Sequence, residues 1–366
     1  MKTLLKPSLN WLFPFVALAI GMHYLKPEAH SWIFAVSCVA IIPLAGWLGK
    51  ATEHLAERTG EGLGGLLNAT FGNAAELIIA LAALQKGLTD VVKASLTGSI
   101  LGNILLVLGM SCLLGGLKYK KQTFNAIGAR AQSTMLTLAA VALIVPAGYH
   151  HLVGKEALLQ ERNLSLDISV VLLITYGLSL LFSLHTHKQL FVGTAAESSE
   201  VQEGKHPKWS LKKSLTVLLL SAGMVGWISE ILVGSVEEAA HAFGMTNIFI
   251  GVIVVAIVGN AAEHSTAILV AIKNRMDLSI GIAIGSSIQI ALFVAPLLVI
   301  ASHFFGPGPM DLVFTPVEVL AIGLAVAVTG QIAGDGESNW LEGVQLLSVY
   351  VILAMIFYFL PELTHS

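Results

Sequence analysis

The chain has 366 residues, of which 55% are apolar and only 12% are charged, and its mean hydropathy is +0.80. A soluble fold of this composition would lack the polar surface needed to cover its hydrocarbon, so soluble enzymes and binding modules are excluded. The net charge of −3 says nothing about partners, and no Lys/Arg run indicates a nucleic-acid partner. The sequence therefore predicts an all-α polytopic membrane protein embedded in a lipid bilayer.

Eleven apolar segments are each long enough to cross the ~30 Å hydrocarbon core of a bilayer as a helix. In chain order they are residues 10–26, 30–57, 62–85, 89–117, 126–147, 165–186, 213–243, 246–273, 278–305, 315–333 and 340–360. The longest polar stretch falls between the sixth and seventh segments. We expect residues 189–212 to form a cytoplasmic linker.

An internal duplication dominates the sequence. GNAAEL at Gly72–Leu77 returns as GNAAEH at Gly259–His264, at an offset of 187 residues (263 − 76), and the match continues without a gap through Ser99 and Ser286. The offset places the third helix on the eighth and the fourth on the ninth. Five helices separate the members of each pair, and because five is odd the two copies cross the membrane in opposite directions.

The predicted fold is therefore an N-terminal transmembrane helix followed by two inverted five-helix repeats. The helix occupies residues 1–29, and the repeats occupy residues 30–188 and 213–366. Of the 20 Lys and Arg residues, 15 lie on the face shared by the N-terminus and the loops that follow even-numbered helices. The positive-inside bias predicts a cytoplasmic N-terminus and an external C-terminus.

Each copy of the repeat places one glutamate, Glu76 or Glu263, inside an apolar, glycine-rich stretch. A bare carboxylate within the bilayer costs several kcal/mol, so both glutamates must face protein, water or a cation. The residues four and three positions earlier are Gly72 and Asn73 in one copy and Gly259 and Asn260 in the other. Carboxylate, amide and main-chain oxygens are the ligands of a hard cation such as Ca²⁺, so the sequence predicts a cation site here.

Other polar residues leave two interpretations open. Ser99 and Ser286 lie on small-residue faces of the partner helices, where they can bind the ion or only permit close packing. Glu53, in ATEHL, and Glu230, in ISEIL, are either carboxylates of an access path or gate or solvated charges at helix ends. His264 points to a different side of its helix from Glu263, where a proton relay and a hydrogen-bonded packing role are both open.

These motifs resemble a known family. NATFGNAAELI with SLTGSILGN, and IVGNAAEH with GSSIQIALFVAP, are similar to the signature repeats of the calcium/proton exchanger (CAX) family within the calcium/cation antiporter superfamily. The resemblance implies an antiporter that exports Ca²⁺ in exchange for H⁺ by alternating access, with Glu76 and Glu263 binding the cation and the competing protons. Alanines precede both glutamates, where the related sodium/calcium exchangers have a Ser/Thr-x-Pro element, which disfavours sodium coupling.

The physics of such a site favours exchange. A divalent ion or two protons neutralise a pair of carboxylates, whereas the empty, ionised pair is costly in a low-dielectric interior. Exchange of another divalent cation such as Mn²⁺, sodium-coupled Ca²⁺ exchange and a cation channel remain alternatives. GDGES at Gly334–Ser338 lacks a second membrane aspartate, so no catalytic residues and no enzyme activity are expected.

The remaining expectations concern partners and location. Ca²⁺ and H⁺ are the expected substrates, and no cofactor is expected. The protein is expected in a prokaryotic inner membrane, and a homo-oligomer is compatible with the sequence.

Overall fold

The computed structural model describes residues 9–59, 61–153, 158–187 and 209–361. The first half contains η1 (Leu9–Leu12), α1 (Pro14–Leu25), α2 (His30–Thr59), α3 (Glu61–Phe71), α4 (Ala74–Gln85), α5 (Thr89–Leu101), η2 (Gly102–Val107), α6 (Leu108–Lys118), α7 (Ala126–Val153), α8 (Leu158–Leu181) and η4 (Phe182–Thr186). The second half contains α10 (Leu211–Val233), α11 (Val236–Phe243), α12 (Asn247–Phe249), η6 (Ile250–Val255), α13 (Ala256–Gly259), α14 (Ala261–Ile272), α15 (Met276–Gln289), η7 (Ile290–Val294), α16 (Ala295–Ala301), α17 (Pro316–Ile332) and α18 (Trp340–Phe359).

Several of these helices are long and apolar enough to cross a membrane. In the described part of the chain there are seven, and eight if α11 and the helix Asn247–Gly259 count as one span bent by 110°. The chain is therefore an integral membrane protein. Most of the predicted linker, residues 189–208, lies outside the described residues, and its last residues begin α10.

Three predicted helices are interrupted. The predicted span 62–85 divides into α3 and α4 at Gly72 and Asn73, and the span 246–273 is interrupted at Asn260. The span 213–243 ends early, because α10 stops at Val233 and α11 begins at Val236. At each GNAAE motif the asparagine leaves helical geometry, with φ −97° and ψ 27° at Asn73 and φ −92° and ψ 3° at Asn260. The expectation that both motifs lie on continuous helices was therefore wrong.

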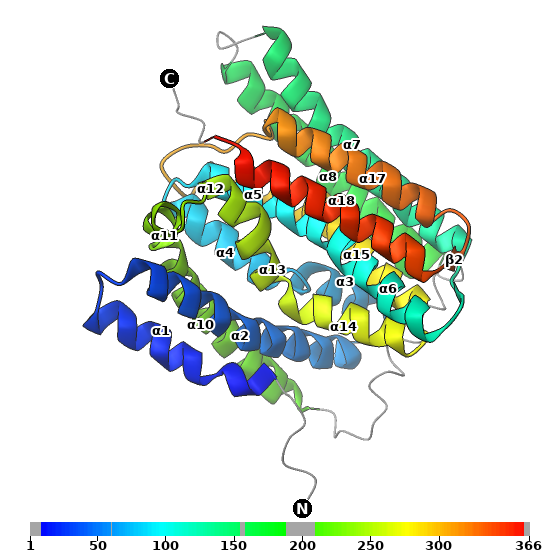
Figure 1. Cartoon of the computed structure of the whole chain (residues 1–366), viewed down its shortest axis with the longest axis horizontal. Coiled ribbons are helices and arrows are strands. Elements are labelled where there is room, and N and C mark those ends of the chain that lie inside the picture. Colours follow the sequence, from blue (N-terminus) through cyan, green and yellow to red (C-terminus); the bar gives the residue numbers. More distant parts are fainter. Residues whose placement is uncertain (1–8, 60, 154–157, 188–208, 362–366) are drawn as a thin grey trace, which may run out of the picture.

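The helices are arranged around a central group that contains both motifs. Helices α1, α2 and α10 lie side by side along one edge of the molecule, and α7, α8 and α17 lie along the opposite edge (Figure 1). Between them, α4 and α5 of the first half pack against α13 of the second half, α5 also packs against α15, and α14 packs against α6 and η2 (Figure 1). The motifs of the two halves therefore meet in the interior of the protein.

Two glycines bring α5 and η6 into backbone contact. A methyl group added at Gly98 would lie 1.9 Å from the main-chain oxygen of Val252, and one added at Gly251 would lie 2.6 Å from Ala94 Cβ. Gly285 is the equivalent of Gly98 in the second copy of the repeat. Among the described residues, a methyl group at Gly285 would meet no atom within 4 Å. The two halves share a sequence pattern but differ in conformation at this crossing.

A small clamp holds the far end of α14. Strand β1 (Gln122–Thr123) pairs antiparallel with β2 (Glu337–Ser338), so loops from both halves are joined. From the first loop, Gln122 Nε2 donates to the main-chain oxygen of Ala271 at 2.9 Å. Lys118 Nζ donates to that of Ile272 at 2.9 Å, so the last carbonyls of α14 are satisfied by side chains from the other half.

The glycine crossing yields a prediction with a built-in control. Gly98→Ala should lower the melting temperature of the detergent-solubilised protein by about 5 °C or more, because the added methyl group overlaps the backbone of η6. Gly285→Ala should leave the melting temperature unchanged or slightly raised, because alanine favours a helix and the position is open. Equal losses of stability in the two variants would contradict the described crossing.

Candidate cation-binding site

Both motif glutamates lie directly after a break in a helix. Glu76 is in the first turn of α4, which follows Asn73, and Glu263 is in the first turn of α14, which follows Asn260. Glu76 is 8% exposed, and Glu263 is half-buried. The unpaired N–H groups and the dipole at a helix N-terminus favour negative charge, so the breaks provide partial compensation for the buried carboxylates.

The two copies of the motif face each other. A methyl group added at Gly72 would lie 3.7 Å from Glu263 Oε1, and one added at Gly259 would lie 3.8 Å from Glu76 Oε1. Each glutamate therefore lies against the glycine of the other copy. The structure therefore brings together the two copies of the motif, which the sequence separates by an offset of 187 positions.

The asparagines and serines also pair across the two copies. Ser286 Oγ donates to Asn73 Oδ1 at 2.9 Å. In the mirrored position, Asn260 Nδ2 donates to Ser99 Oγ at 3.0 Å. All four side chains are buried, so the predicted site residues of both copies form one polar centre within an apolar core.

Three oxygens at this centre lack a hydrogen-bond partner. In the described part of the chain, Glu76 Oε2, Glu263 Oε2 and Asn260 Oδ1 are buried and unpaired. Buried polar atoms in folded proteins are normally satisfied, so such a cluster indicates a group that is bound there in function. No three carboxylate, histidine or cysteine side chains converge among the described residues. A cation at this centre would therefore take two carboxylates and complete its shell with neutral oxygens.

Sequence reasoning missed one member of the polar centre, Asn103. It lies in η2, a π-helical segment that begins directly after α5, and its Nδ2 donates to Ser286 Oγ at 3.1 Å. Asn103 Oδ1 lies 3.1 Å from His264 Nε2, so His264 has the hydrogen-bonded packing contact that was one of its two interpretations. The available signal was spacing, since Asn103 follows Ser99 by one helical turn.

Glu53 and Glu230, the carboxylates expected in an access path or gate, lie on α2 and α10, two helices that pack against each other. Glu53 is half-buried near the end of α2, and Glu230 is exposed near the end of α10. The main-chain oxygen of Glu230 accepts a hydrogen bond from Lys86 Nζ at 3.3 Å, which links α10 to the end of α4.

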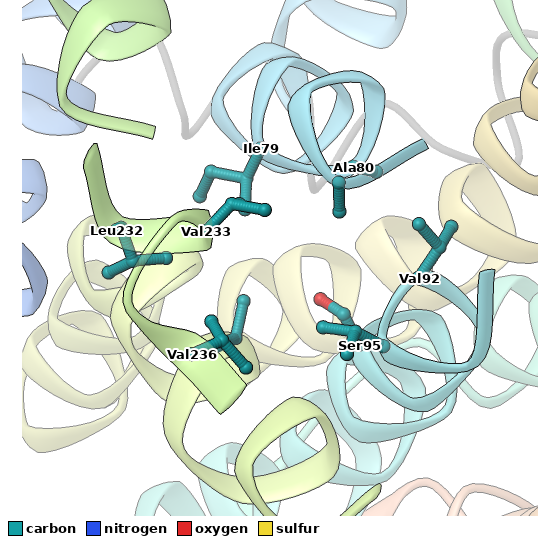
Figure 2. Close-up of a pocket in the computed structure, with 10 residues that line it drawn as sticks. Ile79, Ala80, Val92, Ser95, Leu232, Val233 and Val236 are labelled. Atoms are coloured by element: carbon teal, nitrogen blue, oxygen red, sulfur yellow. The ribbon is translucent and has the colours of Figure 1, made fainter. Parts of the chain in front are cut away.

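An apolar pocket lies beyond Glu76 along α4. Ile79, Ala80 and Ala83 follow Glu76 on the same face of the helix, and they line the pocket together with residues of α5, η6 and the α10 to α11 junction. In Figure 2, the side chain of Ile79 lies beside Val233, and Ala80 lies across the pocket from Val236. Ser95 is the one polar side chain in the lining. Among the described residues that line this pocket, none is charged. The pocket therefore offers a cation no charged ligand toward the C-terminal end of α4.

A buried carboxylate pair at breaks in membrane helices is typical of a secondary transporter. The sodium/calcium exchanger protein family model matches residues 29–185 and 213–359. The chain is 50% identical to the Ca²⁺/H⁺ antiporter ChaA of Bacillus subtilis, over 90% of this chain and 92% of that protein. It is 46% identical to a Ca²⁺/H⁺ antiporter of Aphanothece halophytica, over 96% of both chains.

Solved structures agree with the sequence comparison. The structure of native YfkE superposes with a TM-score of 0.79 at 44% identity, and the match covers 95% of this chain and all of that one. The chain therefore belongs to the sodium/calcium exchanger protein family, in its calcium/proton exchanger (CAX) branch.

Proposed function

We propose that this protein exports Ca²⁺ in exchange for H⁺ through the polar centre formed by the two GNAAE motifs. The observation that carries the proposal is the pair of buried, unpartnered carboxylate oxygens of Glu76 and Glu263, from opposite halves of the chain. The relatives named Ca²⁺/H⁺ antiporters are matched over nearly their whole length, which supports the same activity here.

The chemistry of exchange follows from charge. One Ca²⁺ neutralises both carboxylates, and so do two protons, whereas the empty pair keeps two charges in a low-dielectric interior. Loaded states can therefore change their access from one side to the other, while the empty state resists that change. This single rule couples calcium movement in one direction to proton movement in the other.

The site residues have distinct proposed roles. Glu76 and Glu263 bind the cation and the protons. Six smaller residues line the site, namely Gly72, Asn73, Ser99, Gly259, Asn260 and Ser286. Glu53 and Glu230 line the access path, where half-burial of Glu53 supports a contact with entering ions.

We further propose that the fold consists of one N-terminal helix and two inverted five-helix repeats, eleven spans in all. The cross-pairing of Asn73 with Ser286 and of Asn260 with Ser99 supports this symmetry. The two segments matched by the family model, 29–185 and 213–359, support a division at the linker.

Alternating access would then move α2 and α10 against the central helices. Two features support this proposal. An apolar wall lies between α4 and the α10 to α11 junction, on the part of α4 that follows Glu76 (Figure 2). In addition, Gly98 is in tight contact with η6, whereas Gly285 has open space around it among the described residues, as expected if the two halves exchange conformations during transport.

The first functional prediction concerns the carboxylates. Glu76→Gln and Glu263→Gln should each reduce calcium/proton exchange by about tenfold or more, because glutamine keeps the size of the side chain but removes charge from the cation shell. The measurement is uptake of radioactive calcium into proteoliposomes under an imposed pH gradient, with unchanged gel-filtration profiles as the folding control. Competition by Mn²⁺, Mg²⁺ and Na⁺ in the same assay distinguishes the alternative substrates, and uptake without a pH gradient would favour a channel. Near wild-type exchange in either variant would remove the carboxylate pair from the mechanism.

A second prediction concerns pH. If protons and calcium share the pair, calcium affinity should fall as the pH falls from 8.5 to 6, with about two protons displaced per ion in the steepest region. Equilibrium binding in detergent measures this dependence, and either glutamine variant should show a shallower slope. An affinity independent of pH in the wild type would separate the proton path from the calcium site.

A third prediction tests the exchange of conformations. Gly285→Ala should reduce transport by about fivefold or more without loss of stability, because the opposite state would need Gly285 to approach a neighbouring backbone as closely as Gly98 does now. Gly177→Ala is the matched control, since Gly177 lies on α8 and a methyl group there also meets nothing within 4 Å. Equal transport by the two variants would argue against a swap at this crossing.

The last prediction concerns orientation. The Lys/Arg bias and eleven spans place the N-terminus in the cytoplasm and the C-terminus outside a prokaryotic inner membrane. A periplasmic reporter fused after Ser366 should therefore be active, and a fluorescent protein that matures only in the cytoplasm should be dark there. The reverse pattern would mean that the number of spans is even.

A further inference from the structure

The two motif asparagines are repeat equivalents, yet their amide groups are engaged differently. Asn73 uses both sides of its amide: Nδ2 donates to Gln289 Oε1 at 2.5 Å, and Oδ1 accepts from Ser286 Oγ at 2.9 Å. Ser286 is held in turn by Asn103, and Asn103 by His264. Asn73 therefore lies within a continuous chain of hydrogen bonds that runs from Gln289 to His264, and both its amide nitrogen and its amide oxygen are engaged.

Asn260 leaves its oxygen unused. Its Nδ2 donates to the main-chain oxygen of Ala256 at 2.9 Å and to Ser99 Oγ at 3.0 Å. A carbonyl oxygen can only accept, so the contact with Ala256 determines which amide atom is the nitrogen. The other atom, Asn260 Oδ1, is buried and has no partner in the part of the chain that the structure describes.

The partners that distinguish the two asparagines have no polar counterparts in the other copy of the repeat. At the offset of 187, Gln289 corresponds to Gly102, Asn103 corresponds to Ile290, and His264 corresponds to Leu77. None of these three counterparts has a polar side chain. The second copy of the motif thus contributes an amide oxygen without a partner among the described residues, whereas the amide of the first copy is held by Ser286 and by Gln289, which has no polar counterpart.

We propose that Asn260 is a direct cation ligand and that Asn73 is a positioning residue. The cation is held by Glu76 Oε2, Glu263 Oε2 and Asn260 Oδ1, displaced from the centre between the two copies toward Asn260. Water and main-chain oxygens complete the six to eight ligands that Ca²⁺ takes. This assignment rests on the proposed function, since it divides the roles within the same site.

The test compares the two asparagines directly. Equilibrium binding of radioactive calcium to the purified full-length protein at pH 8 should be weakened at least about tenfold more by Asn260→Ala than by Asn73→Ala, because only the former removes a ligand oxygen. The melting temperature without calcium should fall more in Asn73→Ala, because Gln289 and Ser286 then lose partners. If both asparagines had only a structural role, the loss of calcium affinity in each variant would follow its loss of melting temperature.

A milder variant keeps the proposal testable if Asn73→Ala does not fold. Gln289→Met removes the acceptor of Asn73 while it preserves volume, and it too should weaken calcium binding at least about tenfold less than Asn260→Ala. Equal losses of affinity, or a larger loss from the Asn73 or Gln289 variant, would overturn the assignment. Failure of the wild type to bind calcium would instead refute the proposed function, so the two failures are distinguishable.

Discussion

The rest of this structure depends on one constraint, the free energy of holding two carboxylates inside an apolar membrane protein. Neither Glu76 Oε2 nor Glu263 Oε2 has a hydrogen-bond partner in the described chain, and no lysine or arginine pairs with them at the polar centre. A permanent ion pair would neutralise the glutamates but would also remove their affinity for calcium. The neighbourhood instead offers weak compensation, from helix N-termini and neutral amides, which leaves most of the stabilisation to the transported ions.

The breaks in the helices follow from the same constraint. A continuous helix would satisfy its own N–H groups and present the carboxylate to a neutral backbone. By ending α3 at Phe71 and beginning α4 at Ala74, the chain exposes unpaired N–H groups beside Glu76, and Asn260 does the same for Glu263. The glycines before the breaks then allow each glutamate to approach the opposite copy. Each of these residues has a physical reason to be next to the others.

The sequence predicts the site better than it predicts the fine structure around it. The duplication locates the glutamates, asparagines and serines, because a polar residue within an apolar membrane chain is costly, and its recurrence at a fixed offset indicates a site built from both copies. The helix breaks were missed because Gly72 and Asn73 lie within a long apolar run, where hydropathy cannot distinguish one helix from two. The end of α10 at Val233 was missed for the same reason, since the small residues Gly234 and Ser235 interrupt the helix without a polar signal.

The unequal use of Asn73 and Asn260 was also beyond the sequence. Their motifs are identical over GNAAE, and the difference comes from Gln289 and Asn103, which lie on other helices. An alignment of the two copies shows that Gln289 and Asn103 have no polar counterpart in the other copy. Only the fold shows that both residues take part in the hydrogen bonds around Asn73. The number of spans and the orientation in the membrane stay predictions.

The clamp at the end of α14 affects how precisely the Glu263 carboxylate is positioned before an ion binds. The helix that carries Glu263 is fixed at its C-terminal end by Lys118 and Gln122, and the turn before its first residue is fixed by the hydrogen bonds of Asn260. A helix anchored at both ends has lost its rocking freedom during folding. The site is therefore preorganised: the entropy of ordering this carboxylate is lost once, when the chain folds, and is not lost again each time an ion arrives.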